Sequence, residues 1–251
     1  MSGFETFLWT AGPYIAFTIL IVGTALRRVF FARTWTSKSS EFLEKKHEKI
    51  GNPIFHAAIL FVFLGHVGGI LIPKVFTDTM GLSEHMYHSM AFLMGGIAGI
   101  ALVAGYVLLA GRRFGGNKRM KANTSTMDKV LYVFLGITIL SGMVATFSNA
   151  AGAFNYRETI SPWFRSLFAL QPQADLMATV PLAFRIHMCC WMVLFSLLPF
   201  TRLVHLFSGI TAPFKYIGRA AIIYRRRAAE KKVAANERVL EFPDGLVPRK
   251  E

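Results

Sequence analysis

Four histidines lie inside long apolar stretches of the sequence. His56 and His66 fall in one stretch, and His187 and His205 fall in another. An ionisable side chain among apolar residues is costly, so its presence is by default a functional hypothesis. A neutral imidazole is also the commonest metal ligand in proteins. A single histidine is more simply read as a hydrogen bond between helices, but four histidines confined to two stretches predict metal or cofactor ligation.

The composition indicates that these stretches cross a membrane. Of the 251 residues, 53% are hydrophobic and only 17% are charged, whereas a soluble domain carries about 25% charged residues. The formal net charge of +14 is spread between and after the apolar stretches, so we expect no nucleic-acid partner. The high hydrophobic fraction and the low charged fraction argue against a cytosolic globular enzyme and against a disordered chain. The predicted fold class is an all-α integral membrane protein.

Five stretches reach the length of about 20 apolar residues that a spanning helix needs. The first lacks a basic leading region and a small-residue cleavage site, so we expect a retained span and not a signal peptide. We predict a five-helix membrane domain over residues 1–206 and a basic tail over 207–251. The expected spans are Phe4–Leu26, Asn52–Pro73, His88–Ala110, Met127–Ser148 and Val180–Leu206.

The distribution of Lys and Arg predicts the orientation of the bundle. Of the 28 basic residues, 24 lie in the connections 27–50 and 111–129 or after residue 201. Basic residues are enriched on the cytoplasmic side. We therefore expect an external N-terminus and a cytoplasmic C-terminus. The tail then either contacts anionic lipid or docks a cytoplasmic partner, and both readings stay open.

The direction of the two histidine-bearing helices decides which histidines can meet. The helices are antiparallel, so His56 and His205 lie toward the cytoplasm, whereas His66 and His187 lie toward the outside. His187 and His205 are 18 positions apart, which is five helical turns and places both on one face. Two facing imidazoles at each of two levels suit axial ligation of two b-type haems. The sequence has no CxxCH motif for covalent haem attachment.

Two features bear on how the haems would fit. The ligand heights differ by about 15 Å on one helix and about 27 Å on the other, so we expect the fifth span to tilt or to kink at Pro199. Glycines beside His66 and on the third span either admit a flat cofactor or serve ordinary small-residue packing. These glycines are Gly65, Gly68, Gly69, Gly95, Gly96 and Gly99.

Two arginines and one outer connection are further candidates. Arg185 and Arg202 precede the histidines of the fifth span by two and three positions, and guanidinium groups suit the carboxylates of haem propionates. Arg202 has a second reading as a topology charge at a helix end. Residues 161–168 are expected along the membrane interface, with aromatic rings toward lipid. The rings expected to face lipid are Trp163, Phe164 and Phe168.

Several short motifs carry a resemblance to a known family. They are Pro13-Tyr14-Ile15-Ala16, Thr34-Trp35, Asn52-Pro-Ile-Phe-His56, Gly65-His66, Met90-Ala-Phe with Gly95-Gly96, Phe184-Arg-Ile-His187 and Pro199-Phe-Thr-Arg-Leu-Val-His205. Together they cover roughly residues 10–210, and the histidine-bearing segments are the specific part. On these motifs the chain resembles the gamma subunit of respiratory nitrate reductase.

The resemblance implies a dihaem cytochrome b that anchors an iron-sulfur beta subunit and a molybdenum-containing alpha subunit. It implies ligand pairs His56/His205 and His66/His187, and quinol oxidation near the outer haem with electrons passing inward. Some family members have a lysine after the second span, where this sequence has Met86, Tyr87 and His88. The residues that we expect to bind quinol are Gly65, His66, Tyr87 and His88, with His88 as a candidate proton acceptor.

Two rival functions stay open on the sequence. A dihaem anchor of another multisubunit oxidoreductase would share the histidine pattern and differ in its soluble subunits. A transporter with a histidine-lined path would need broken helices and inward acidic ligands, and the spans hold almost no acidic residue. A reduced-minus-oxidised absorbance spectrum separates a haem protein from a transporter.

Overall fold

The computed structural model describes residues 1–30, 46–115 and 118–207. Every regular element in these ranges is helical, and no strand occurs in them. The chain divides into two compact units, Met1–Val204 and His205–Glu251, and the helical bundle belongs to the first. The basic tail predicted for 207–251 lies outside the described residues except for Phe207.

Five helical segments of the described chain are long and apolar enough to cross a membrane. Less than a third of each segment is buried within the protein, so most of the apolar surface is left for lipid. This confirms the predicted all-helical class with five spans. The segments are Gly3–Phe30, Lys49–Leu71, Glu84–Phe114, Thr126–Ser148 and Leu182–Phe200.

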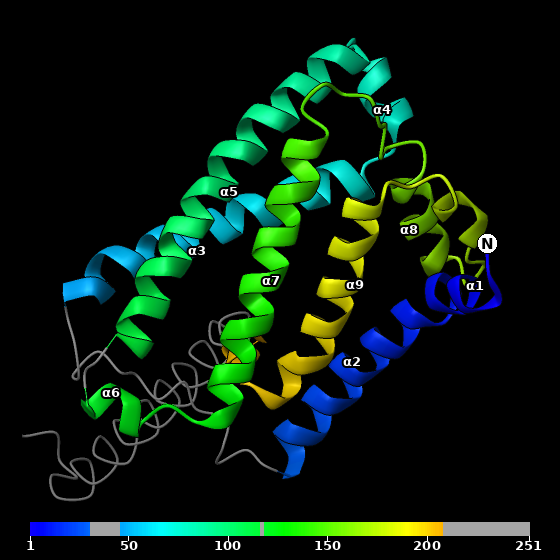
Figure 1. Ribbon diagram of the computed structural model, residues 1–251. Helices are drawn as coiled ribbons and strands as arrows, with labels where there is room; N and C mark the ends of the chain where they lie inside the picture. Colours follow the sequence, from blue (N-terminus) through cyan, green and yellow to red (C-terminus); the bar gives the residue numbers. More distant parts are fainter. Residues whose placement is uncertain (31–45, 116–117, 208–251) are drawn as a thin grey trace, which may run out of the picture. The chain divides into compact units, whose positions relative to one another are not determined.

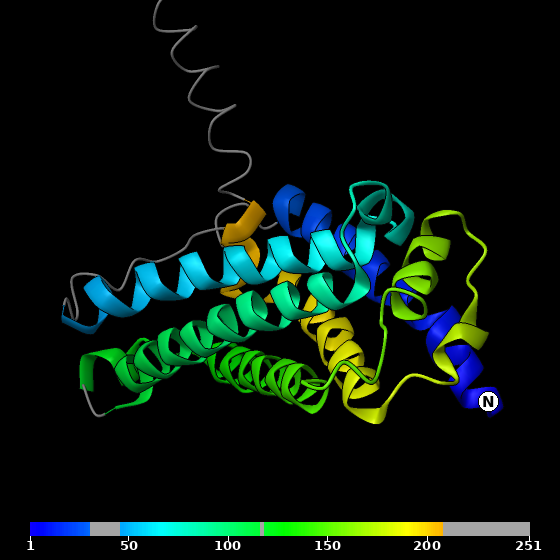
Figure 2. The same cartoon turned by 90° about the horizontal axis from the view of Figure 1, so that it is seen from above.

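The long helices pack as a series of neighbours. In order of contact they are α3 (Lys46–His66), α5 (Glu84–Phe114), α7 (Thr126–Ser148), α9 (Leu182–Leu197) and α2 (Gly12–Phe30). Figures 1 and 2 show α3 and α5 side by side. A Cβ atom on Gly105 of α5 would lie 2.7 Å from the backbone nitrogen of Phe55 on α3. Glycine is therefore what lets these two backbones approach so closely.

The start of α5 differs from the predicted span. The helix begins at Glu84 and not at His88, because the hydroxyl of Ser83 caps it by accepting a hydrogen bond from the backbone nitrogen of Met86, at 3.3 Å. His85 and His88 therefore lie on the first two turns of this helix.

The end of the fifth span also differs from the prediction. Helix α9 ends at Leu197, and two short 3₁₀ turns follow, Leu198–Phe200 and Arg202–Val204. The predicted distortion at Pro199 is present, since proline cannot donate the hydrogen bond that would continue the helix. The expectation of one helix running to Leu206 is wrong, so the rise of about 27 Å for a continuous helix no longer applies.

The second span ends in a widened turn. Helix α3 runs to His66 and continues as a π-helical turn over Val67–Leu71, a feature that is frequent at functional sites. The carbonyl of Ile70 in this turn accepts hydrogen bonds from the Ser161 hydroxyl at 2.7 Å and from Arg165 at 3.0 Å. The turn thereby anchors a short outer helix to the second span.

That outer helix, α8 (Ile160–Phe168), is buried on the side that the sequence placed in lipid. Trp163 has no exposed surface, lies edge-on to Trp9 of α1 (Gly3–Thr10) with ring centroids 5.9 Å apart, and donates to the Trp9 carbonyl at 3.0 Å. The prediction that Trp163 faces lipid is wrong, whereas Phe168 is 67% exposed. Residues five positions apart lie on different faces of a helix, so Trp163 points into the protein while Phe168 points outward.

A 3₁₀ turn, Ala174–Met177, lies between α8 and α9, and two further short helices lie in the connections. They are α4 (Lys74–Thr79), between the π-helical turn and α5, and α6 (Lys118–Ala122), between α5 and α7. Lys74 and Thr77 of α4 contact Glu158 and Arg157 of the 149–159 connection, as described below.

Candidate functional site

The structure brings together the outer histidine pair predicted from the sequence. The rings of His66, at the end of α3, and His187, in the second turn of α9, lie with centroids 6.0 Å apart and planes inclined by 43°. Imidazole–metal bonds of about 2 Å on both sides of one ion place two coordinating rings about 6 Å apart. The spacing therefore fits a shared metal atom, and the ligand role stays a prediction.

Hydrogen bonds decide which nitrogen each of these rings presents. Nδ1 of His66 lies 2.7 Å from the carbonyl oxygen of Val62, which can only accept, so Nδ1 carries the proton. Nδ1 of His187 lies 3.1 Å from the Ser141 hydroxyl, which itself donates to the Thr138 carbonyl at 3.0 Å. Both rings therefore carry the lone pair on Nε2, as second-shell partners commonly arrange for metal-binding histidines.

The inner histidines are described separately. His56 on α3 repeats the pattern of His66, because its Nδ1 donates to the Asn52 carbonyl at 2.9 Å. His205 belongs to the second compact unit. The pairing of His56 with His205 stays a prediction.

Glycines shape the space around the outer pair. A Cβ atom on Gly142 of α7 would lie 2.9 Å from Cε1 of His187, so this glycine makes room for the imidazole ring. Four of the predicted glycines have open space where a side chain would stand: Gly65, Gly68, Gly95 and Gly96. Gly96 is nevertheless buried. Gly96 therefore leaves room inside the protein for a flat group, whereas Gly65 and Gly95 are exposed, and Gly69 and Gly99 pack against Tyr156 and Met143.

The described residues hold no cluster of three or more His, Cys, Asp or Glu side chains that could bind a metal ion. A b-type haem needs no such cluster, because the porphyrin supplies four nitrogens and the protein only the axial ligands. Cys189 and Cys190 on α9 are free thiols. The donor set around His66 and His187 therefore suits a haem better than a protein-only metal centre.

Both candidate arginines have carboxylate partners within the chain. Arg185 lies 2.9 Å from Glu5, and Nε of Arg202 lies 2.8 Å from Asp128. Asp128 also contacts Arg113 at 3.0 Å, and its side chain is only 3% exposed. The arginines thus tie helices together, and their proposed contact with propionates stays a prediction.

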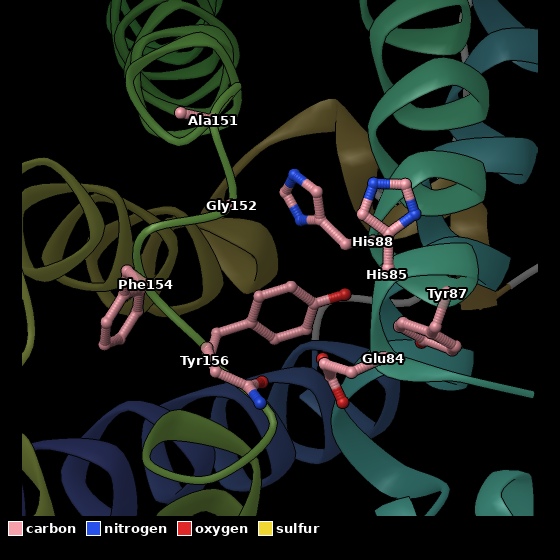
Figure 3. Close-up of a pocket in the computed structure, with 9 residues that line it drawn as sticks. Glu84, His85, Tyr87, His88, Ala151, Gly152, Phe154 and Tyr156 are labelled. Atoms are coloured by element: carbon pink, nitrogen blue, oxygen red, sulfur yellow. The ribbon is translucent and has the colours of Figure 1, made fainter.

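A cavity of about 220 Å³ opens between the start of α5 and the connection that follows α7. Figure 3 shows its side chains converging from these two segments. We call it the outer cavity, because the predicted orientation places it on the external side. Tyr87 and His88 line it, whereas Gly65 and His66 are not among its lining residues. The lining residues are Glu84, His85, Tyr87, His88, Ala151, Gly152, Phe154, Asn155 and Tyr156.

His88 is held at the cavity wall by backbone. Its Nε2 lies 3.3 Å from the carbonyl oxygen of Ala150, so Nε2 donates and Nδ1 carries the lone pair. A side chain on Gly152 would come within 3.0 Å of the ring, and the positive φ of +69° at Gly152 favours glycine as well. The His88 ring thus has one defined orientation.

Charged groups from three segments stabilise the rim of the outer cavity, beside Glu84 and Tyr87. Buried Arg157 donates to Glu84 at 3.4 Å and to Thr77, and its guanidinium lies 3.8 Å from the centroid of the Tyr87 ring. Lys74 lies 2.5 Å from Glu158, and its hydrogen bond to that carboxylate raises the pKa of Lys74. The rim is therefore a small network of ion pairs capped by a cation–π contact.

Comparison with known proteins identifies the family of this chain. The family described as nitrate reductase gamma subunit matches residues 5–227. The chain belongs to this family. It is 45% identical over 229 residues to the "Nitrate reductase gamma chain" of Bacillus subtilis (strain 168), covering 91% of this chain and all of that protein. It is 32% identical over 225 residues to the "Respiratory nitrate reductase 2 gamma chain" of Escherichia coli (strain K12), covering 89% and 97%.

A longer relative matches the same region. This gamma subunit is 46% identical over 222 residues to the "Nitrate reductase-like protein NarX" of Mycobacterium tuberculosis (strain ATCC 25618 / H37Rv). The match covers 87% of this chain but only 33% of NarX, so the chain spans about a third of that relative. The resemblance seen in the sequence motifs is thus confirmed at the level of the family.

Three residues at the site of this gamma subunit were missed by the sequence analysis. Ser141 and Gly142 contact His187, and Tyr156 lines the outer cavity. Ser141 and Gly142 sit in an ordinary small-residue helix sequence, and Tyr156 sits in a connection. Local sequence carries no signal for such contacts, because each depends on a segment far away along the chain.

Proposed function

We propose that this gamma subunit is the dihaem cytochrome b of a respiratory nitrate reductase, which oxidises quinol and passes the electrons inward. The membrane domain is residues 1–206, with the N-terminus outside and the tail 207–251 in the cytoplasm. The membrane is a prokaryotic inner membrane. The partners are an iron-sulfur beta subunit and a molybdenum-containing alpha subunit, where nitrate is reduced.

The observation that carries this proposal is the His66–His187 pair. Two imidazoles 6.0 Å apart, each with its proton fixed on Nδ1, offer two Nε2 lone pairs to one metal atom. Axial ligation by two histidines is a familiar way to hold a haem. His56 and His205 are proposed to hold the second haem at the cytoplasmic level, and Arg185 and Arg202 to contact propionates.

The chain's own residues account for the rest of the proposed mechanism. When bound, the haems supply one-electron transfer from the outer to the inner side. Val62 and Ser141 keep the two outer ligand rings in the required tautomer. Quinol binds near Gly65, His66, Tyr87 and His88, and each quinol gives up two electrons and two protons. Nδ1 of His88 is the proposed acceptor of a proton, which then leaves to the outer solution.

The proposed function is tested by a reduced-minus-oxidised absorbance spectrum combined with haem quantification. The complete nitrate reductase complex should contain two b haems in the gamma subunit, and quinol should reduce them. His66→Ala or His187→Ala should remove one haem and abolish reduction by quinol, whereas dithionite should still reduce the remaining haem. Normal quinol-dependent reduction in either variant would show that the proposed route is wrong.

A further inference from the structure

The side chain of Tyr156 reaches from the connection after α7 across the outer cavity toward the first turn of α5 (Figure 3). A Cβ atom on Gly69 would lie 3.2 Å from the Tyr156 hydroxyl and 3.5 Å from the Tyr87 hydroxyl. The two phenol oxygens therefore converge on one point of the π-helical turn. Gly69 follows His66 by three positions, which is about one helical turn.

The surroundings of Tyr87 hold its ring and place its hydroxyl beside that of Tyr156. The guanidinium of Arg157 covers the ring face at 3.8 Å, and Arg157 is itself buried and bonded to Thr77 and Glu84. The hydroxyl of Tyr156 is the neighbour of the Tyr87 hydroxyl, since both phenol oxygens lie within 3.5 Å of the position that a Cβ atom on Gly69 would take, and the two side chains interact electrostatically. The position of the Tyr87 oxygen thus depends on Tyr156.

The Tyr156 hydroxyl can act as a hydrogen-bond donor at every physiological pH. Burial raises the pKa of Tyr156, and interaction with Tyr87 raises it further. The charged groups that face the pair are Arg157, which opposes this shift, and Glu84, which adds to it. The hydroxyl therefore keeps its proton through the neutral range and well above it, so its effect on a neighbour does not change with physiological pH.

We propose that Tyr156 is a quinol-positioning residue, whose hydroxyl fixes the Tyr87 oxygen above Gly69 so that Tyr87 meets one hydroxyl of the quinol head group. This inference rests on the proposed quinol oxidation and adds a residue from outside the histidine-bearing spans. An aromatic diol is the ligand that the site chemistry selects, because one of its hydroxyls can share a hydrogen bond with a phenol at the cavity wall.

The test uses the complete nitrate reductase complex with menadiol, a soluble naphthoquinol, as the electron donor. Tyr156→Phe removes one hydroxyl and keeps the ring. Loss of one neutral hydrogen bond changes an equilibrium by about five-fold, so the KM for menadiol should rise about five-fold while kcat stays near that of the wild type. The rise should be equal at mildly acidic and mildly alkaline pH, because Tyr156 does not titrate there.

A double-mutant cycle separates positioning from independent binding. If Tyr156 acts through Tyr87, the Tyr87→Phe/Tyr156→Phe variant should have no higher KM than Tyr87→Phe alone. Tyr14→Phe is the matched control, because the Tyr14 hydroxyl donates to the Leu167 carbonyl at 2.9 Å in the contact between α2 and α8. It should leave the KM unchanged, and all variants should keep both haem bands and full reduction by dithionite.

The outcomes are distinguishable. An unchanged KM in Tyr156→Phe, or effects of the two tyrosine substitutions that multiply, would overturn the positioning role alone. An increase in the Tyr14→Phe control as large as that in Tyr156→Phe would also overturn it, since the loss would then be structural. A wild-type complex whose haems menadiol does not reduce would overturn the proposed function together with this inference.

Discussion

An imidazole offers a metal only one nitrogen, and the partner of the other nitrogen decides which one it is. In His56 and His66 that partner is the carbonyl four residues earlier in the same helix, so the helix itself sets the tautomer. In His187 it is a hydroxyl from a neighbouring helix. The ring of His187 is therefore oriented by the packing of α7 against α9, so substitutions on α7 should alter its orientation.

Ser141→Ala tests this dependence. Loss of the Nδ1 partner removes the hydrogen bond that orients the His187 ring and lowers the basicity of Nε2, and changes of this kind typically weaken metal binding about 10–100-fold. We expect the outer haem to be lost more readily on detergent washing, measured as haem per polypeptide. Ser196→Ala is the control, because the Ser196 hydroxyl donates only to the Met192 carbonyl of its own helix. Equal haem retention in the two variants would contradict the prediction.

Gly142→Ala should act on the same ring by steric contact. Its new methyl group would lie 2.9 Å from Cε1 of His187, closer than Cβ atoms approach a ring, so the imidazole must shift. We expect the outer haem band to be reduced or displaced in the absorbance spectrum while the inner band persists. Gly111→Ala on α5 introduces the same methyl group where nothing lies within 4 Å, and it should leave both bands intact.

At the scale of helices, Asp128 joins three elements. It forms a capping box with Ser125 at the start of α7, and it pairs with Arg113 from the end of α5 and with Arg202 after α9. The cap of α7, the ion pair with α5 and the ion pair with the segment after α9 thus all depend on the nearly buried carboxylate of Asp128. Its removal should loosen all three connections at once.

Asp128→Asn keeps a capping side chain but removes the charge. Breaking a buried ion pair from one side is strongly destabilising, by about 3–5 kcal/mol, because Arg113 would remain buried without its counter-ion. We expect a clearly lower thermal unfolding midpoint in detergent. Glu158→Gln, which breaks the exposed Lys74–Glu158 pair, should cost less than about 1 kcal/mol. Equal midpoints would show that the Asp128 cluster contributes little.

Features that follow from the composition and periodicity of one segment could be predicted from the sequence. Contacts between segments far apart along the chain could not. Hydropathy predicted five spans and helix direction predicted the His66–His187 encounter, because both follow from the chain's own periodicity. The burial of Trp163 was missed because it requires Trp9, 154 positions away. The contact of Arg185 with Glu5, 180 positions away, was missed for the same reason, because it leaves no local trace.

At the scale of the molecule, the proposed orientation depends on the asymmetry of basic residues. Alkaline phosphatase folds actively only outside the cytoplasm, so fused before residue 1 or within the 149–159 connection it should be active. Fused within the connection 116–125 it should be inactive, because basic residues keep that side in the cytoplasm. Reversed activities would overturn the orientation and, with it, the assignment of the outer cavity to the external side.

The three-membered cluster at Asp128 also implies an order of events during synthesis. Arg113 and Asp128 lie on consecutive spans, so their charges can neutralise each other as soon as α7 has left the ribosome. Arg202 is translated 74 residues later, which at about 5–20 residues per second is a delay of about 4–15 seconds. The contact between α5 and α7 can therefore form before the last span is complete, and Arg202 then adds the ion pair that joins the end of that span to it.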